Sequence, residues 1–150
     1  MEKRECLVSI DSAFAKDDRK YEGFYEETSD RIRVSWTQPE EEKGQGDSRF
    51  LLSYRVGEKV LRMSRRGAAE TDMTFQAGEK TEGIMRTSHG DFDLTMETFK
   101  ISFFPEDADE ETVIDGQVYL VKTAALTYNL FFPNQEPMLN SMIFKVHLVK

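Results

Sequence analysis

Residues that favour turns recur at nearly regular intervals in the middle of the chain, and this rhythm constrains the fold more than any other feature. With strand-like runs between them, they stand about eleven residues apart, at Gly57-Glu58, Gly67-Ala68-Ala69, Gly78-Glu79 and Ser88-His89-Gly90. Short strands at such spacing are typical of an antiparallel meander that forms a sandwich or a barrel. Residues 49–103 therefore predict an architecture, but no motif in them identifies an activity.

Two of these turns predict hairpin registers. Gly57-Glu58 suits a two-residue type II′ turn, because glycine occupies the first central position. The expected pairs are Phe50 with Arg65, Leu52 with Met63 and Tyr54 with Leu61. Gly78-Glu79 repeats the device, and its expected pairs are Thr71 with Arg86, Met73 with Ile84 and Phe75 with Glu82.

The third hairpin and the strand after it can be read from the positions of their apolar residues. A three-residue loop, Ser88-His89-Gly90, pairs Ile84 with Leu94 and keeps the apolar residues on one face. A two-residue turn at His89-Gly90 would reverse that face, because a slip of one residue reverses every side chain. We therefore expect the three-residue loop. Apolar residues then change from even to odd positions near Thr98, which predicts a β-bulge there; they are Phe92, Leu94 and Met96, then Phe99, Ile101 and Phe103.

The rest of the chain extends the same pattern. Ile32, Val34 and Trp36 alternate with polar residues, as in a half-buried strand. Asp115-Gly116 is a strong signal for a type I′ hairpin. Long apolar alternations follow from Val118 and from Met138, and the second would close the sheet. We predict one all-β domain over residues 1–150, a closed antiparallel meander barrel of about 8–10 strands.

Charge and composition narrow the expected partners and location. The net charge of −8 and the isoelectric point near 4.9 argue against nucleic acid, because phosphate binding needs a clustered basic face. No apolar run approaches the ~18 residues of a membrane span. The residues after Met1 lead into a strand-like run and not into the apolar core of a signal peptide. The sole cysteine, Cys6, excludes an intrachain disulfide and is expected to be a small buried hydrophobe. We expect a cytoplasmic protein.

Several short runs resemble one known family. The runs are Val60 to Ala68 with Arg65 and Gly67, Met73-Thr74-Phe75 with Gly78, Arg86-Thr87-Ser88-His89-Gly90, Met96-Glu97-Thr98, and Glu22-Gly23-Phe24-Tyr25. Together they are similar to the YwiB-like family, functionally uncharacterised β-barrel proteins of Gram-positive bacteria grouped with the calycin-like barrels. The family usually has a proline and an aromatic residue where this chain has Ser88 and His89. The resemblance implies a lipocalin-like barrel and a cytoplasmic location, and it brings no activity, cofactor or catalytic residue.

The hairpin registers place three charged side chains, Arg65, Glu82 and Arg86, on the inward face of the barrel, with both arginines at one end. Buried charges need a partner, water or a ligand. One interpretation is a barrel mouth where the arginines hold a carboxylate or phosphate. The apolar lining would be Phe50, Tyr54, Met73 and Phe75, with Glu82 toward the other end. The other is that both arginines pair with acidic loop residues, of which the chain has many among its 28 Asp and Glu.

Catalysis is not expected. His89 stands in a turn and His147 on the outward side of the last strand, and neither has a neighbouring Ser, Cys or Asp motif of known geometry. We predict no metal site and no cofactor. Two functions remain open: a barrel that binds a small acidic or amphipathic molecule, or a filled barrel that binds a protein partner or a second copy through its exterior. The second predicts an exposed apolar patch, involving Leu139, Ile143 and Tyr119.

Overall fold

The computed structural model describes residues 3–12, 19–39 and 46–150. Within these ranges it contains eleven strands and one 3-10 helix. The strands are β1 (Lys3–Ser12), β2 (Tyr21–Glu27), β3 (Arg31–Pro39), β4 (Asp47–Arg55), β5 (Val60–Arg66), β6 (Glu70–Gln76), β7 (Lys80–Thr87), β8 (Gly90–Phe103), β9 (Glu110–Ile114), β10 (Gln117–Phe131) and β11 (Met138–Val149), and the helix is η1 (Glu106–Ala108). A helix long and apolar enough to cross a membrane is not found in the described ranges.

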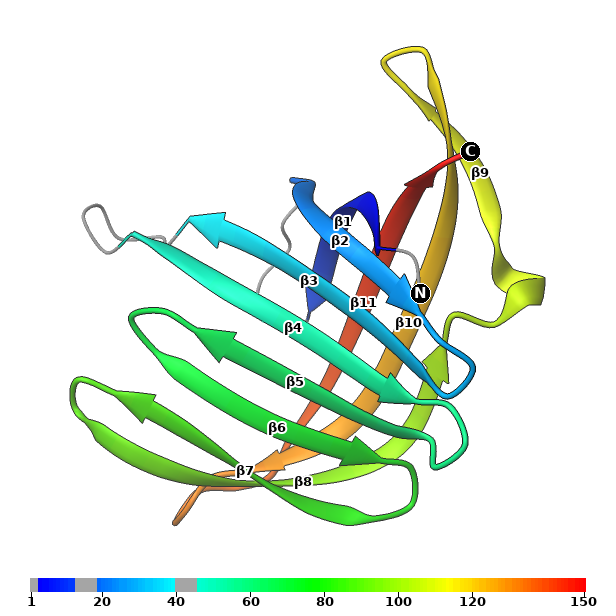
Figure 1. Ribbon diagram of the computed structural model, residues 1–150. Coiled ribbons are helices and arrows are strands. Elements are labelled where there is room, and N and C mark those ends of the chain that lie inside the picture. The colour runs from blue at the N-terminus through cyan, green and yellow to red at the C-terminus, as the bar shows by residue number, and fades with distance from the viewer. Residues whose placement is uncertain (1–2, 13–18, 40–45) are drawn as a thin grey trace.

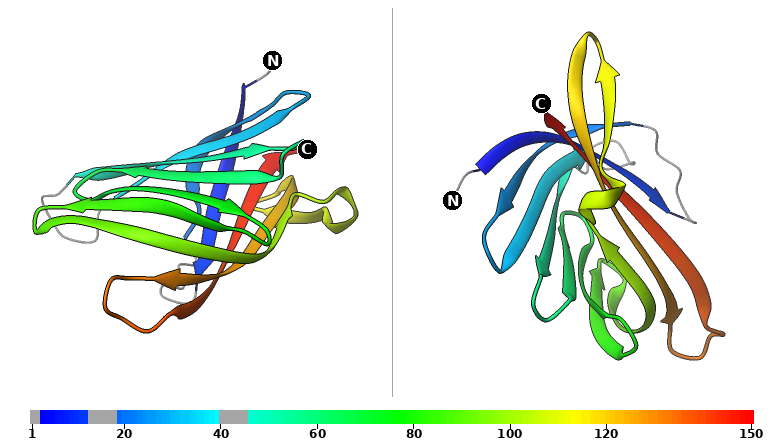
Figure 2. Two further views of the ribbon diagram at one scale, coloured as in Figure 1. Left: turned by 90° about the horizontal axis from the view of Figure 1, so that it is seen from below. Right: turned by 90° about the vertical axis from the view of Figure 1, so that its right-hand side faces the viewer.

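The strands form one antiparallel sheet that closes on itself. β1 to β8 pair in order, β8 pairs with β10, β10 with β11, and β11 returns to β1. The predicted closed antiparallel barrel is therefore confirmed, with ten of the described strands in the closed circuit. β9 lies outside it and pairs with the first part of β10, so the β9–β10 hairpin projects from the barrel (Figure 1 and Figure 2). Its turn is the expected type I′, with φ of 50° at Asp115 and 80° at Gly116.

The barrel is flattened, and its opposite walls touch. In Figure 1, β3 to β6 cross in front of β10 and β11 at a steep angle. Rings from strands that are not neighbours meet across the interior, since every second residue of a strand points inward. The contacts, given by the distance between ring centroids, are Trp36 to Phe144 at 6.3 Å, Phe75 to Tyr128 at 4.9 Å and Tyr54 to Phe103 at 4.3 Å. At these levels the barrel encloses packed side chains, as small barrels commonly do.

The first hairpin has the predicted register but a different turn. Phe50 lies opposite Arg65, Leu52 opposite Met63 and Tyr54 opposite Leu61, as expected. The turn covers residues 56–59, and Lys59, not Gly57, takes the positive φ, of 57°. The Lys59 amide donates to the Arg55 carbonyl oxygen over 2.7 Å. The predicted type II′ turn is wrong, although the longer loop leaves the strand register unchanged.

The next two hairpins both differ from the prediction by one residue. Thr71 lies opposite Met85, not Arg86, because the loop has three residues with Gly78 at φ 80°. Gly83, not Ile84, lies opposite Leu94, because the next turn has two residues, Ser88 and His89. The two slips cancel on β8, so Leu94 and Met96 face inward as predicted, and only β7 is reversed.

The reversal of β7 follows from the cost of burying charge. The predicted inward set contains two charged side chains, Glu82 and Arg86, whereas the observed one contains none of the charged residues of the strand; it consists of Thr81, Gly83, Met85 and Thr87. Glu82 and Arg86 are exposed, and Met85 packs against the core. Moving an unpaired charge out of water costs more than exposing one aliphatic side chain.

The predicted bulge on β8 is confirmed. Lys100 lies opposite Thr127 and Thr98 opposite Tyr128, so Phe99 is the extra residue and the register of β8 against β10 shifts there. Thr98 is fully buried while Phe99 is 51% exposed. The expectation that Phe99 joins the inward set is therefore wrong, although Ile101 and Phe103 do pack against the core. A bulge bends the strand and increases its twist, which helps the sheet to close.

Candidate functional site

The inward arginine of the predicted barrel mouth, Arg65, lies against other side chains of this chain. Its guanidinium carbon stands 5.5 Å from the centre of the Phe50 ring, and Phe50 stacks on Trp36 with 5.1 Å between centroids. The Arg65 Nε–H donates to the hydroxyl of Ser48 over 3.3 Å, and Ser48 is buried. A cation over an aromatic face is stabilised by the ring quadrupole, so packing within the chain orients this charge.

The apolar residues predicted to line a ligand cavity belong to the packed interior. Phe75 is fully buried and Met73 is 7% exposed. Phe75 contacts Tyr128, and Tyr54 stacks on Phe103 at an interplanar angle of 15°. These side chains fill space between the walls.

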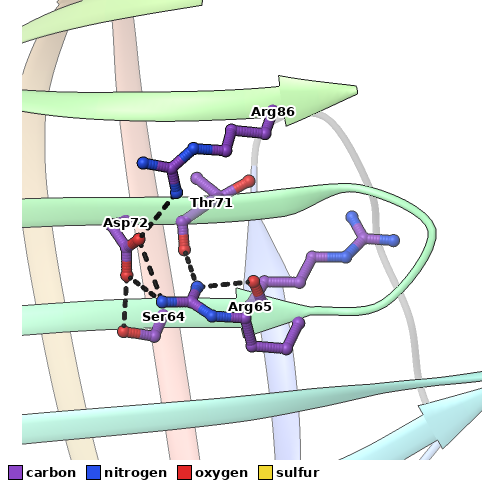
Figure 3. Close-up of polar contacts among 6 residues, drawn as sticks. Ser64, Arg65, Thr71, Asp72 and Arg86 are labelled. Atoms are coloured by element: carbon purple, nitrogen blue, oxygen red, sulfur yellow. Dashed lines mark hydrogen bonds and ion pairs between the residues drawn. The ribbon is translucent and has the colours of Figure 1, made fainter. Parts of the chain in front are cut away.

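Glu82 and Arg86 do not face the interior, which corrects their predicted placement. The reversed register of β7 puts both on the outer surface, where Arg86 lies opposite Glu70 and Glu82 opposite Thr95. The structure therefore does not bring Arg65 and Arg86 together at a barrel mouth. In Figure 3 the Arg65 side chain extends away from Arg86.

Arg86 instead belongs to a polar cluster centred on Asp72, on the outside of β5, β6 and β7 (Figure 3). Asp72 accepts two hydrogen bonds from Arg66, of 2.9 and 3.0 Å, and one of 3.0 Å from Ser64. An Arg86 nitrogen lies 3.9 Å from the same carboxylate. Partial burial raises the pKa of Asp72, but the hydrogen bonds from Arg66 and Ser64 and the two positive charges outweigh it, so the pKa lies below its ordinary value.

A larger group of cations covers the outer surface of the neighbouring strands. We call the outward arginines of β3, β4 and β5 the arginine face. It consists of Arg31, Arg33, Arg49, Arg55, Arg62 and Arg66. These side chains alternate with buried residues such as Ile32, Val34, Leu52 and Leu61. In a chain of net charge −8, six arginines are thus gathered on three adjacent strands.

The strand register sets arginines of this face directly against each other. Arg31 lies opposite Arg55, and Arg49 opposite Arg66. Like charges placed directly opposite on neighbouring strands destabilise a sheet. Within the described ranges, Arg31, Arg33, Arg49 and Arg62 form no ion pair with a carboxylate. In each opposed pair one arginine has a carboxylate partner, Glu58 for Arg55 and Asp72 for Arg66, so the repulsion between the opposed side chains is offset only in part.

Two shallow depressions lie on the arginine face. The smaller, which we call the arginine hollow, has a volume of about 200 Å³ and is lined by Arg31, Arg33, Arg55 and Arg62 with Leu51, Ser53, Val60 and Ser64. The larger, of about 570 Å³, is more open and includes Lys3, Arg33, Arg49 and Arg66, with Glu26 at its edge. Arg33 lines both. An anion on this surface would meet guanidinium groups on several sides.

Asp30 directly precedes Arg31 of the arginine hollow, and the pKa of its carboxyl group is lowered. The pKa of Asp30 lies below its ordinary value, first because the Thr28 hydroxyl donates to it over 2.8 Å. A backbone hydrogen bond and the charges of Arg31 and Arg55 lower it further. Asp30 is fully exposed.

The residues of the arginine face were missed because the sequence interpretation followed the apolar residues and ignored the polar ones between them. The alternation Arg31-Ile32-Arg33-Val34 already places both arginines on one outward face. The predicted register of β4 and β5, which is correct, also implies Arg49 opposite Arg66. The register of β3 against β4 could not be read from the sequence, because the connection between them has no recognisable turn.

A second outer surface is apolar. A depression of about 380 Å³ is lined by Leu7, Phe24, Tyr119 and Val149, with Cys6, Gly23 and two glutamates, Glu5 and Glu22. Phe24 is 42% and Val149 49% exposed. Of the residues expected in an exterior patch, Leu139 is 66% and Ile143 37% exposed, whereas Tyr119 is only partly exposed.

The histidines and acidic groups form no recognisable reaction centre in the described ranges. His89 is an exposed turn residue, and His147 is 5% exposed with its Nδ1 3.3 Å from the Leu7 carbonyl oxygen. Burial lowers the pKa of His147, and the charges of Lys20 and Lys145 lower it further against the opposing effect of the Leu7 carbonyl. The described His, Cys, Asp and Glu side chains include no group of three or more that could hold a metal ion.

Comparison with known proteins gives a fold and a family. The crystal structure of ywiB protein from Bacillus subtilis is similar to this chain with a TM-score of 0.69 and 15% sequence identity, over 99% of this chain and 94% of that one. At that identity the likeness concerns the fold alone. No curated protein matches the chain. A family model described as "Domain of unknown function (DUF1934)" matches residues 13–142. The chain belongs to this DUF1934 family, a YwiB-like family of β-barrel proteins.

Proposed function

We propose that this protein is a non-catalytic binding module that holds an anionic partner on its arginine face. The observation that carries the proposal is that two pairs of arginines are directly opposed, Arg31 with Arg55 and Arg49 with Arg66. Arrangements that lower the stability of a free protein are expected at functional sites, where a ligand compensates for them. An anion bound between the opposed side chains would turn a repulsive contact into an attractive one.

The chemistry of arginine supports an anionic ligand. The contacts between side chains in the interior favour a binding site on the outside of the barrel. Guanidinium groups form charge-assisted, often bidentate, hydrogen bonds with carboxylates and phosphates. The expectation of an acidic ligand is thus retained, but its site moves from the barrel end to the exterior. Arg86 and Glu82 are outside, and rings such as Phe75 and Tyr128 meet between the walls.

The test uses retention on a heparin column, a sulfated polyanion, at pH 7.5 and low salt. A protein of net charge −8 is repelled by heparin unless its cations are clustered on one face. We expect the wild-type chain to be retained and to elute with added salt, because surface electrostatics are screened.

The variant Arg31→Gln/Arg33→Gln/Arg62→Gln should pass through that column. Its matched control is Lys80→Gln/Lys100→Gln/Lys145→Gln, which removes three exposed lysines from other strands. Both variants change the net charge by the same amount, so only the position of the lost charges differs. A wild-type chain that flows through, or a control that loses retention as fully as the arginine variant, would refute the proposal.

A second candidate function is self-association through the apolar depression of Leu7, Phe24, Tyr119 and Val149. It is favoured by the near half exposure of Phe24 and Val149, which both line this depression, since exposed apolar surface marks interaction sites. Sedimentation equilibrium should then give a mass that rises with protein concentration, and Val149→Lys should abolish the rise. A monomer at every concentration would exclude this function.

A further inference from the structure

We infer that the arginine hollow is a binding site for a phosphate group, carried by a small phosphorylated molecule. The inference rests on the proposed function and makes it specific, because it names one position on the arginine face and one ligand chemistry. The lining of the hollow includes Arg31, Arg55 and Val60, which adjoin the β2–β3 and β4–β5 turns, and these two turns lie at the same end of the barrel wall in Figure 1.

The register puts four arginines in two adjacent outward rows of β3, β4 and β5. Arg31 and Arg55 are directly opposed, and Arg33 and Arg62 lie on either side of Ser53 in the next row. Directly opposed side chains start about 5 Å apart, and residues two apart on a strand about 7 Å apart. Flexible arginine side chains from these four positions can therefore converge on a single anion above Ser53.

The number of donors favours phosphate over carboxylate. One carboxylate carries a single negative charge and two acceptor oxygens, which one bidentate guanidinium can already engage. A phosphate monoester carries about −1.5 to −2 charges at neutral pH and three strong acceptor oxygens, which suits several guanidinium groups at once. Ser53 and Ser64 add hydroxyl donors to the lining. Glu58 already stands 3.7 Å from Arg55 in an exposed ion pair, which a more highly charged anion would displace.

The size of the hollow favours a small ligand. A depression of about 200 Å³ accommodates a phosphate group and a short attached segment, with the remainder in solvent. The phosphates of a nucleic-acid backbone have the same chemistry, but a chain of them would extend along the strands. It would then contact Arg49 and Arg66 in the larger depression as well as the arginine hollow.

The experiment follows the Nε–H NMR signals of the arginines during titration with inorganic phosphate at constant ionic strength and pH 7.5. We expect saturable shifts of Arg31, Arg33, Arg55 and Arg62, with a dissociation constant on the order of 1 mM. Acetate at the same ionic strength should leave these signals in place. Arg33→Gln/Arg62→Gln should weaken phosphate binding by at least about tenfold, while Lys80→Gln/Arg86→Gln, which also removes two charges but from β7, should leave it unchanged.

The outcomes distinguish failure of this inference from failure of the proposed function. They also distinguish two sources of the phosphate group, a small phosphorylated molecule and a nucleic acid. A phosphorylated small molecule that binds at least as tightly as a short oligonucleotide supports the inference. Tighter binding of the oligonucleotide, with shifts of Arg49 and Arg66, supports a phosphate site but overturns the small-molecule source. Heparin retention without any phosphate shift, or equal shifts with acetate, overturns the inference alone. A wild-type chain that neither stays on the heparin column nor binds phosphate refutes both the inference and the proposed function.

Discussion

Removing arginines from the arginine face should leave the protein as stable as before or make it slightly more stable. The variant Arg31→Gln/Arg33→Gln/Arg62→Gln keeps the length and hydrogen-bonding capacity of the side chains but removes three charges. If the free protein tolerates this change, the charges serve binding and not folding. The same variant then separates loss of binding from loss of structure.

The magnitude can be worked from the register. Arg31 and Arg55 start about 5 Å apart at their β-carbons, and flexible side chains can separate their charges to about 7 Å. Two unit charges at that distance in water repel by roughly 0.6 kcal/mol, and physiological salt reduces this to roughly 0.3 kcal/mol. The variant removes several such neighbours, but Glu26, which lies opposite Arg33, and Asp30 offset part of the gain. We expect the free energy of unfolding to rise by between zero and about 1 kcal/mol.

The assay is urea denaturation at low and at moderate salt, with the lysine variant Lys80→Gln/Lys100→Gln/Lys145→Gln as the control. Salt should stabilise the wild-type chain more than the arginine variant, because screening relieves a repulsion that the variant lacks. A loss of more than about 1 kcal/mol in the arginine variant would refute the reasoning, since the arginines would then be structural.

Four further predictions concern the interior and its titratable groups. Phe75→Ala should lower the free energy of unfolding by about 3–5 kcal/mol in urea denaturation, because Phe75 is fully buried and packs against Tyr128. Gly83→Ala should lower it by about 1–3 kcal/mol, since the added β-carbon would stand 2.5 Å from the Asp72 carbonyl oxygen. Cys6 is 6% exposed, and burial raises the pKa of its thiol to about 12, so a thiol reagent should label it only as the protein unfolds. The pKa of His147 is lower in the folded than in the unfolded chain, so the unfolded chain binds the extra proton and stability should fall as the pH drops below about 6.5.

Each of these predictions has a control or an outcome that would contradict it. Gly57→Ala should be nearly neutral, because no atom lies within 4 Å of its added β-carbon and its φ is not positive. His147→Gln should flatten the pH dependence of stability near pH 6, and an unchanged slope would contradict the assignment. A cost below about 2 kcal/mol for Phe75→Ala would mean that the interior has room to spare. Rapid labelling of Cys6 in the native protein would show that the end of β1 opens without global unfolding.

The local sequence pattern predicted strand register and turns correctly where one face of a strand is apolar and a short turn joins it to the next strand. The register of Phe50 with Arg65, the bulge beside Thr98 and the Asp115-Gly116 turn were all correct. β7 was misplaced because glycine was expected to set the turn length, whereas the free energy depends on which side chains the whole wall buries. Counting the charges of each face of residues 80–87 would have given the correct orientation.

The predicted barrel mouth was wrong in placing Glu82 and Arg86 inside, since both lie on the outer face. Its residues were assigned to a cavity because they face inward, but inward residues of a small barrel fill it unless the walls stand apart. The distance between opposite walls is a property of closure and flattening, which bring Tyr54 to Phe103 and Phe75 to Tyr128. The distance between opposite walls of the barrel cannot be predicted from the sequence pattern of a single strand.

The sequence by itself determined the all-β class, the closed meander and most of the inward and outward alternation, because these depend on turn residues and on a period of two along each strand. Only the tertiary structure decided which residues lie opposite each other across the long connection between β3 and β4. That pairing joins Arg31 and Arg33 of β3 to Arg55 of β4 and, through β4, to Arg62 of β5. Charges that are spread over the printed sequence become neighbours only when the strands pair, and their repulsion and affinity for an anion arise from that closeness.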